Sequence, residues 1–158
     1  RGYDGGKRVK GRKRHILVDT LGLLIAVLIT GAGLDDGSAA PQLLALISAT
    51  AFPRLATIFG DNKYHNHDLQ AWMATHRPTW CLEVKTRPEG STGFIPLRQR
   101  WVVERTNAWN GRDRRNSKDY ERKPASSAVM IQISSVNLML NRLSPRSEPV
   151  FRYRQKAA

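Results

Sequence analysis

The chain has 158 residues, enough for one domain with a buried core, and carries 26 Lys and Arg against 13 Asp and Glu. The resulting formal charge of +13 predicts a polyanionic partner, with nucleic acid favoured over an anionic membrane surface. The single cysteine, Cys81, excludes a disulfide framework and a cysteine-based zinc site and is typical of a reducing cytosol. The most apolar run, residues 16–34, is interrupted by Asp19 and glycines, so we expect a cytoplasmic protein without a membrane span.

The charge is unevenly distributed along the chain. Residues 1–14 carry seven basic side chains and 98–123 carry nine, whereas the centre, 15–97, holds five basic residues against seven acids. This pattern predicts an active centre with a basic rim, although a generally basic surface remains an alternative. We expect residues 1–14 to form a mobile Gly-rich arm or loop, 15–143 the folded domain and 144–158 a disordered basic tail.

In chain order, the sequence predicts two strands, a helix, a strand, a helix, a strand and two helices. The strands are expected at 15–19, 23–30, 55–60 and 80–87. The helices are expected after Gly33, capped by Asp35, Asp36 or Ser38, and at 67–76, 100–109 and 125–143. The first two strands should form a hairpin around Asp19–Gly22, and a loop should cover 88–93. Two adjacent strands followed by alternation predict an α/β fold with a mixed sheet flanked by helices.

The last predicted helix has a regular apolar pattern. Val129, Ile133, Val136, Leu140 and Leu143 recur at helical spacing, which indicates an amphipathic helix. Trp101 and Trp109, in the preceding helix, could stack on nucleic-acid bases, but their spacing beside Val102 and Val103 favours a place in the core.

Two acidic residues are candidates for metal binding. Asp61 ends an apolar strand, where ligands gather in open α/β sheets, and Glu104 lies in the most basic stretch, RWVVERTNAWNGRDRR. Two such carboxylates could hold Mg²⁺ or Mn²⁺, while Arg100 and Arg105 hold phosphates. The alternative is structural: Asp61 caps a turn, and Glu104 pairs with Arg100 on one helix face.

Three segments resemble insertion-sequence DDE transposases of the IS-four/IS-five type. They are GYDGGKRVKGRKRHILVDTLGLL, FGDNKYHNHDLQAW and FIPLRQRWVVERTNAWNGRDRRNSKDYE, and the resemblance extends from about Gly2 to Leu143. It implies an RNase H-like core that cleaves and joins transposon-end DNA with two divalent metal ions. By position, Asp61 would be the second acid of the catalytic triad and Glu104 the third. Arg100 matches the arginine of the family's tyrosine–arginine–glutamate–lysine signature, but Leu97 and Gly111 stand at its tyrosine and lysine positions, with Arg112 next to the latter.

The resemblance also indicates what is missing. The family's first catalytic aspartate lies on a first strand that would precede Arg1, and neither Asp4 nor Asp19 is a convincing substitute. We therefore expect a catalytic-domain fragment that is inactive alone, works as a homo-oligomer on double-stranded DNA near the bacterial nucleoid, and is completed by an upstream transposase segment. The alternative is a non-catalytic, basic DNA-binding remnant with structural carboxylates. In either case the basic arm is expected to contact DNA phosphates, through Lys7, Lys10, Arg12, Lys13 and Arg14.

Overall fold

The computed structural model describes residues 2–86, 90 and 98–144, so the loop expected at 88–93 and the tail after Ser144 lie almost entirely outside it. The order of elements confirms the α/β prediction, with two short elements added. The strands are β1 Gly2–Asp4, β2 Val9–Val18, β3 Leu24–Gly31, β4 Thr57–Gly60 and β5 Cys81–Val84. The helices are α1 Asp36–Ala45, the 3₁₀ turn η1 Asn62–Tyr64, α2 His67–His76, α3 Arg98–Arg112 and α4 Pro124–Leu143.

The predicted hairpin is confirmed as β2 and β3. The strands pair antiparallel from Arg12–Gly31 to Val18–Leu24. Asp19 closes the turn twice: its carbonyl accepts the N–H of Gly22 at 3.0 Å, and its carboxylate accepts those of Leu21 and Leu23. An aspartate at the first turn position therefore does what its type predicts.

The basic N-terminal segment is more ordered than the sequence indicates. β1 pairs antiparallel with the start of β2, so residues 9–14 extend a long strand instead of forming a mobile arm. The reason is that Arg12 and Arg14 find hydrogen-bond acceptors in the loop between α3 and α4, as described below. Glycine and charge content alone did not reveal those acceptors.

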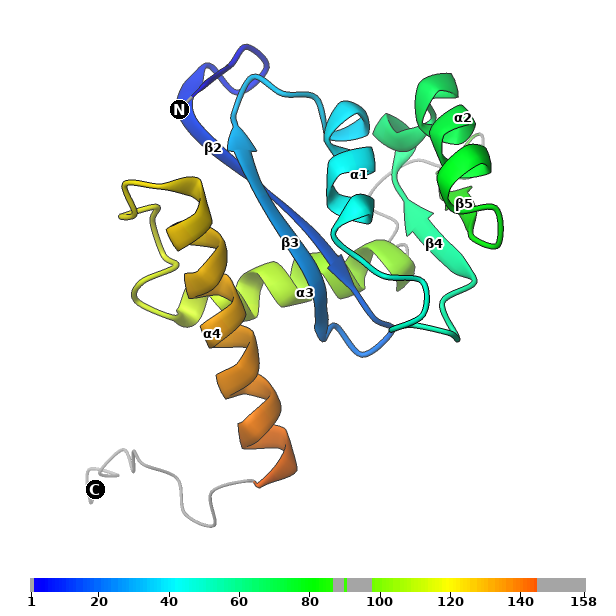
Figure 1. Ribbon diagram of the computed structural model, residues 1–158. Helices are drawn as coiled ribbons and strands as arrows, with labels where there is room; N and C mark the ends of the chain where they lie inside the picture. Colours follow the sequence, from blue (N-terminus) through cyan, green and yellow to red (C-terminus); the bar gives the residue numbers. More distant parts are fainter. Residues whose placement is uncertain (1, 87–89, 91–97, 145–158) are drawn as a thin grey trace, which may run out of the picture.

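Within the described residues, the strands form two separate sheets. One has the order β1-β2-β3, and the other is the parallel pair β4-β5. Helix α1 packs against β2 and β3, and α3 contacts both β2 and β4 from the opposite side (Figure 1). The edge of β2 from Arg12 to Val18 that does not pair with β3, and the edge of β4 that does not pair with β5, have no partner strand in the described part of the chain. The single mixed sheet expected from the sequence is therefore divided in two.

The main core lies between α1, α2 and the sheets. Leu43, Leu44 and Ile47 from the α1 region pack with Leu69 and Met73 of α2, together with Ile58 and Trp80. Arg77 closes the end of this layer: its guanidinium lies over Trp72 and Trp80 and donates to the carbonyls of Leu44 and Ile47. Trp80 is buried and Cys81 exposed, as the strand alternation predicts.

Helix α4 forms where predicted, but its apolar face is exposed to solvent instead of being buried in the core. Its buried residues are Ser127, Ile131, Ser134 and Ser135. Ile131 packs on Val27 and Ile29 of β3, and Ser134 forms hydrogen bonds with residues that follow α3. The five residues of the predicted apolar face are between 48% and 83% exposed: Val129, Ile133, Val136, Leu140 and Leu143. Trp101 of α3 is also exposed, so the interpretation of it as a core residue is wrong. None of the described helices is long and apolar enough to cross a membrane.

Candidate active site

Helix α3 is fixed on the β2–β3 turn, and this contact sets the position of Glu104. Gly22 has φ +83°, and a Cβ on it would lie 2.7 Å from Thr106 Oγ1. Thr106 donates to the carbonyl of Gly22 at 2.9 Å, and Arg105 donates to that of Leu21 at 3.0 Å. The absent side chain lets helix and turn approach closely, and Glu104 lies next to this anchored pair.

Asp61 is positioned by the turn that follows β4. Its Oδ1 accepts the N–H of Lys63 at 3.0 Å, which caps η1 and confirms the turn-capping role considered for it. Tyr64 returns against Gly60, where a Cβ would lie 3.0 Å from its ring. Burial, followed by the charges of Asp36 and Asp61, raises the pKa of Tyr64 to about 12, so the phenol stays protonated. Strand end, turn and tyrosine therefore hold the Asp61 carboxylate in one place.

Asp61 and Glu104 line the same groove, between the two sheets. The groove has a cavity volume of about 230 Å³, with Ile16 and Leu17 of β2 on one side and Ile58 and Phe59 of β4 on the other. Helix α1 contributes Leu43 and Leu44, whereas α3 contributes Arg100, Val103 and Glu104. The walls are thus mostly apolar, with two carboxylates and the cations Arg100 and Lys85 among them.

The ion pair suggested by the sequence is also present. Arg100 Nη2 lies 3.7 Å from Glu104 Oε1, and both side chains are about half exposed, 48% and 54%. An exposed pair of this kind contributes well under about 1 kcal/mol to stability. The pairing therefore does not explain why the carboxylate faces the groove, and it leaves the oxygen atoms accessible.

The donor chemistry of the pair suits a hard divalent ion, because Mg²⁺ and Mn²⁺ prefer carboxylate oxygens. In the described residues, no group of three His, Cys, Asp or Glu side chains is close enough to hold a metal. Asp61 and Glu104 therefore supply part of a ligand set. They fit the type of ion that the sequence suggests, but they do not enclose it.

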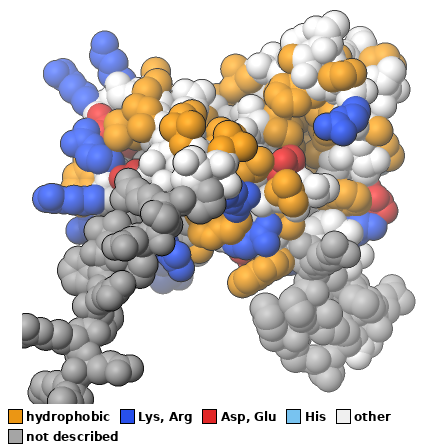
Figure 2. Space-filling view, turned by 90° about the horizontal axis from the view of Figure 1, so that it is seen from below, with side chains coloured by type: hydrophobic (Ala, Val, Ile, Leu, Met, Phe, Trp, Pro, Cys, Tyr) orange, Lys and Arg blue, Asp and Glu red, His pale blue; other side chains and the backbone are white. Residues whose placement is uncertain are grey.

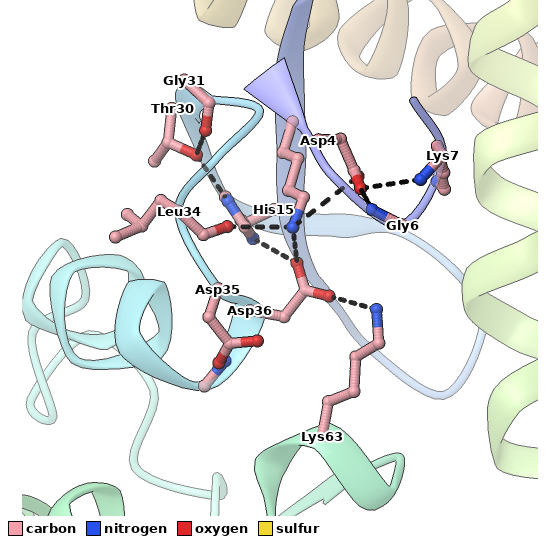
Figure 3. A network of polar contacts seen from close by, with 12 residues as sticks. Asp4, Gly6, Lys7, His15, Thr30, Gly31, Leu34, Asp35, Asp36 and Lys63 are labelled. Carbon is pink, nitrogen blue, oxygen red and sulfur yellow. Dashed lines mark hydrogen bonds and ion pairs between the residues drawn. The ribbon is translucent and has the colours of Figure 1, made fainter. Parts of the chain in front are cut away.

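A polar cluster on β2, α1 and η1 supports this site (Figure 3). Asp36, in the first turn of α1, accepts from Lys63 Nζ at 3.0 Å and lies 3.8 Å from Lys13 Nζ and 3.6 Å from His15 Nδ1. Lys63 belongs to the turn that Asp61 caps, so the cluster fixes η1 against α1 and β2. Of the residues expected to cap α1, Asp35 is the one that does so, because its carboxylate accepts the N–H of Gly37, whereas Asp36 serves the cluster.

Burial and charge shift two pKa values in this cluster. Burial lowers the pKa of His15, and the nearby Asp36 carboxylate opposes this only partly; His15 Nε2 lies 2.8 Å from Thr30 Oγ1. The hydrogen bond from Lys63 to Asp36 raises the pKa of the lysine. His15 is therefore a neutral, buried part of the framework at neutral pH.

Two of the predicted DNA-binding arginines are engaged inside the protein. Arg12 donates to Asp119 Oδ2 at 3.0 Å and to the carbonyls of Glu121 and Arg122, and its side chain is only 7% exposed. Arg14 donates to the carbonyl of Asn116 at 2.8 Å. Both arginines connect β2 to the loop between α3 and α4.

The remaining predicted DNA contacts differ in how accessible they are. Lys7, Lys10 and Arg112 are exposed. Lys13 donates to the carbonyl of Leu34 at 2.9 Å, and Arg105 stacks on Trp109 with 4.8 Å between its guanidinium carbon and the ring centroid. An open depression of about 1120 Å³ is lined by basic residues of β2, by Lys7 and by Lys63. Figure 2 shows a group of Lys and Arg side chains at the left-hand end of the molecule, and single ones among hydrophobic and uncharged side chains over the rest of that face.

Sequence reasoning did not find the roles of Asp36, Lys63 and Lys85. The stretch DDG before an apolar helix signals a cap, but it does not show which aspartate serves as one. Lys85 follows the strand β5 by one residue and lines the groove, with Glu83 as its ion-pair partner. Only the parallel pairing of β4 with β5 brings it near Asp61.

Comparison with known proteins identifies the family of this chain. The family model described as "Transposase DDE domain" matches residues 1–141. A protein of Burkholderia cepacia described as "Putative transposase for insertion sequence element IS402" is 28% identical over 142 residues, covering 84% of this chain and 64% of its own length. The chain thus spans somewhat less than two thirds of that relative. No solved structure matches significantly.

Proposed function

Because the chain belongs to the transposase DDE-domain family, we propose that it supplies two carboxylates and a basic surface to metal-assisted DNA strand transfer. The observation that carries the proposal is the shared groove: Asp61 from β4 and Glu104 from α3, 43 residues apart in sequence, line one cavity together with Arg100. In this role, Asp61 and Glu104 hold Mg²⁺ or Mn²⁺. The complete enzyme would use two ions, which activate a nucleophile and stabilise the leaving oxygen at phosphorus.

Arg100 has a separate role in this proposal. Arg100 lines the groove and its guanidinium lies beside Glu104, so it can hold a phosphodiester oxygen next to the ion site. The hydrogen bond that Asp61 Oδ1 accepts from the N–H of Lys63 orients the carboxylate. The chain's own residues thus bind and orient the ion and the phosphate.

We propose that the site is completed by a further extended segment between β2 and β4, supplied by an upstream part of a transposase polypeptide. Support comes from the two strand edges that have no partner among the described residues, and from the apolar groove between them, which α1 and α3 also line. Such edges readily accept another strand. Hydrogen exchange tests this: backbone amides of residues 12–18 should become protected in a longer product that includes the segment, and unchanged exchange would contradict it.

Metal binding tests the carboxylate roles directly. In a calorimetric titration with Mn²⁺, Asp61→Asn and Glu104→Gln should each weaken binding by about tenfold or more, because each removes one charged ligand. Asp68→Asn is the matched control, since Asp68 is an exposed acid on α2 that does not line the groove. If all three variants bind Mn²⁺ like the parent, the carboxylates are structural, and the non-catalytic DNA-binding remnant becomes the better description.

DNA binding is proposed to use the exposed lysines of the N-terminal hairpin. We expect Lys7→Gln and Lys10→Gln each to reduce the slope of log affinity against log salt by about one, because each removes a phosphate contact. Arg54→Gln, at an exposed position outside the basic depression, is the control. Arg12 and Arg14 are unsuitable for this test, because their internal hydrogen bonds make their substitution a test of folding.

A further inference from the structure

The exposed apolar residues of α4 form a straight stripe with a defined repeat. Val129, Ile133, Val136, Leu140 and Leu143, here named the α4 stripe, follow one another at intervals of four, three, four and three residues. This alternation is the seam of a heptad repeat, the pattern by which one helix packs along another. The stripe lies opposite the helix face that contacts β3, and within residues 2–86, 90 and 98–144 its side chains remain exposed.

The composition of α4 indicates what kind of partner the stripe fits. Arg142 is the only charged residue between Pro124 and Leu143, in a protein of net charge +13. Its guanidinium lies 4.5 Å from the ring centroid of Trp109, on the side of the helix away from the stripe. The residues that flank the stripe are uncharged: Met130, Gln132, Asn137, Met139 and Ser144.

An uncharged seam favours a partner with the same surface. A partner selected by its acidic or basic charge would need opposite charges beside the stripe, and α4 offers none. A second copy of α4 brings an identical apolar seam with polar, uncharged flanks, and so pairs without like-charge repulsion. Elsewhere on this basic molecule, self-association would bring positive charges together.

The position of α4 also permits such pairing. The C-terminal half of the helix extends away from the sheets in Figure 1, which leaves room for a second helix along that half. Close packing of α4 on β3 through Ser127 and Ser135 holds the helix in place without using the stripe. We propose that two copies of this chain associate through the α4 stripe, helix against helix. The stripe consists of five side chains of one helix, whereas a standard interface uses about 20–30 residues a side, so the dimer should be weak, with dissociation in the micromolar range or above.

Adjacent residues provide a matched test by sedimentation velocity. Leu140 lies in the stripe, whereas its neighbour Asn141 is exposed on a different face. The parent and Asn141→Asp should sediment as dimers at high concentration, and Leu140→Asp as a monomer with unchanged circular dichroism. A parent that remains monomeric at several hundred micromolar, or a Leu140→Asp dimer, would overturn the proposal.

A cross-linking experiment separates a second copy from any other occupant. Val136 is the middle residue of the stripe. In a parallel pair it faces Val136 of the second copy, whereas in an antiparallel pair it faces Ile133 of the second copy. In a Cys81→Ser background, Val136→Cys alone, or mixed with Ile133→Cys, should therefore form a disulfide-linked dimer on mild oxidation, and Asn141→Cys should not. If neither Val136→Cys sample forms the dimer, or if Asn141→Cys cross-links equally well, another surface or partner covers the stripe and the proposal is overturned.

Discussion

Helices α1 and α4 both have an apolar face, but α1 buries this face in the core and α4 exposes it to solvent. Helix α1 buries Leu43 and Leu44 in the main core, while α4 buries serines and exposes its stripe. The neighbouring surfaces explain the difference. Helix α1 covers the apolar faces of β2 and β3, whereas α4 approaches β3 through small side chains around Ile131. Periodicity therefore predicts that a helix forms, but the surface it meets decides which face is buried.

The largest effect on stability is expected from a substitution on the buried face of α1. Leu44 is 4% exposed within the main core, so Leu44→Ala removes buried methyl groups and leaves a cavity. We expect a loss of about 2–5 kcal/mol in the free energy of unfolding. Urea denaturation measures it, with Leu140→Ala, on the exposed stripe of α4, as the control. Equal losses for the two variants would remove the distinction between the helices.

A smaller effect is expected on the buried polar face of α4. Ser134 donates to Asp113 Oδ2 and accepts from Asn116 Nδ2 at 2.7 Å, and the bond to Asp113 is the main reason that the pKa of this acid is lowered. Ser134→Ala leaves the buried amide of Asn116 without this partner, at a cost of about 1–3 kcal/mol in urea denaturation. Gln132→Ala, on an exposed part of the same helix, should change stability far less. If Ser134→Ala left the free energy of unfolding unchanged, the hydrogen bonds of Ser134 would not contribute to stability.

The cluster next to α1 predicts a pH dependence of stability. Because burial lowers the pKa of His15, the unfolded chain binds a proton near pH 6.5 before the folded protein does. Stability contributed by neutral His15 is therefore complete above pH 6.5 and falls as the pH drops toward the lowered value, by up to about 1.4 kcal/mol per pH unit. Urea titrations from pH 7.5 to 5 should show this slope in the parent and in His65→Gln, whose histidine is exposed, and a reduced slope in His15→Gln. The same slope in all three would assign the proton uptake elsewhere.

The smallest expected effect concerns the stripe itself. Val129 is 48% exposed, so Val129→Thr should change the free energy of unfolding of the single chain by no more than about 0.5 kcal/mol. Thermal unfolding at low micromolar concentration, where copies do not associate, is the suitable measurement. A loss above 1.5 kcal/mol would show that the α4 face is buried in the monomer and would bring α4 close to α1 in behaviour.

Local chemistry was enough to predict much of the fold. The Asp19 turn, the alternation around Trp80 and the apolar periods of α1 and α2 each specify an element through contacts within a few residues. Predictions failed where a distant segment decides the outcome. The order of residues 9–14 depends on acceptors more than 100 residues away, and the orientation of α4 depends on the surface of β3.

The candidate site follows the same division. The sequence predicts that Asp61 follows a strand and that Glu104 lies on a helix with Arg100, and the structure confirms both. Their common groove depends on α3 crossing both β2 and β4, which no local pattern specifies. Their roles in metal binding, and those of the predicted DNA-contacting residues, remain predictions that the experiments above address.

The bonds of Arg12 have a consequence for the order in which the protein forms. They join residues separated by 107 to 110 positions, from the start of the chain to the loop after α3. During synthesis, the β2–β3 hairpin emerges from the ribosome long before residues 119–122. The guanidinium of Arg12 therefore lacks these acceptors until the loop after α3 has been made. The first half of β2 should therefore become ordered late, after α3 has been released, and contacts of such long range slow folding. A nascent chain halted before residue 119 would expose an incompletely ordered β2 to chaperones and proteases.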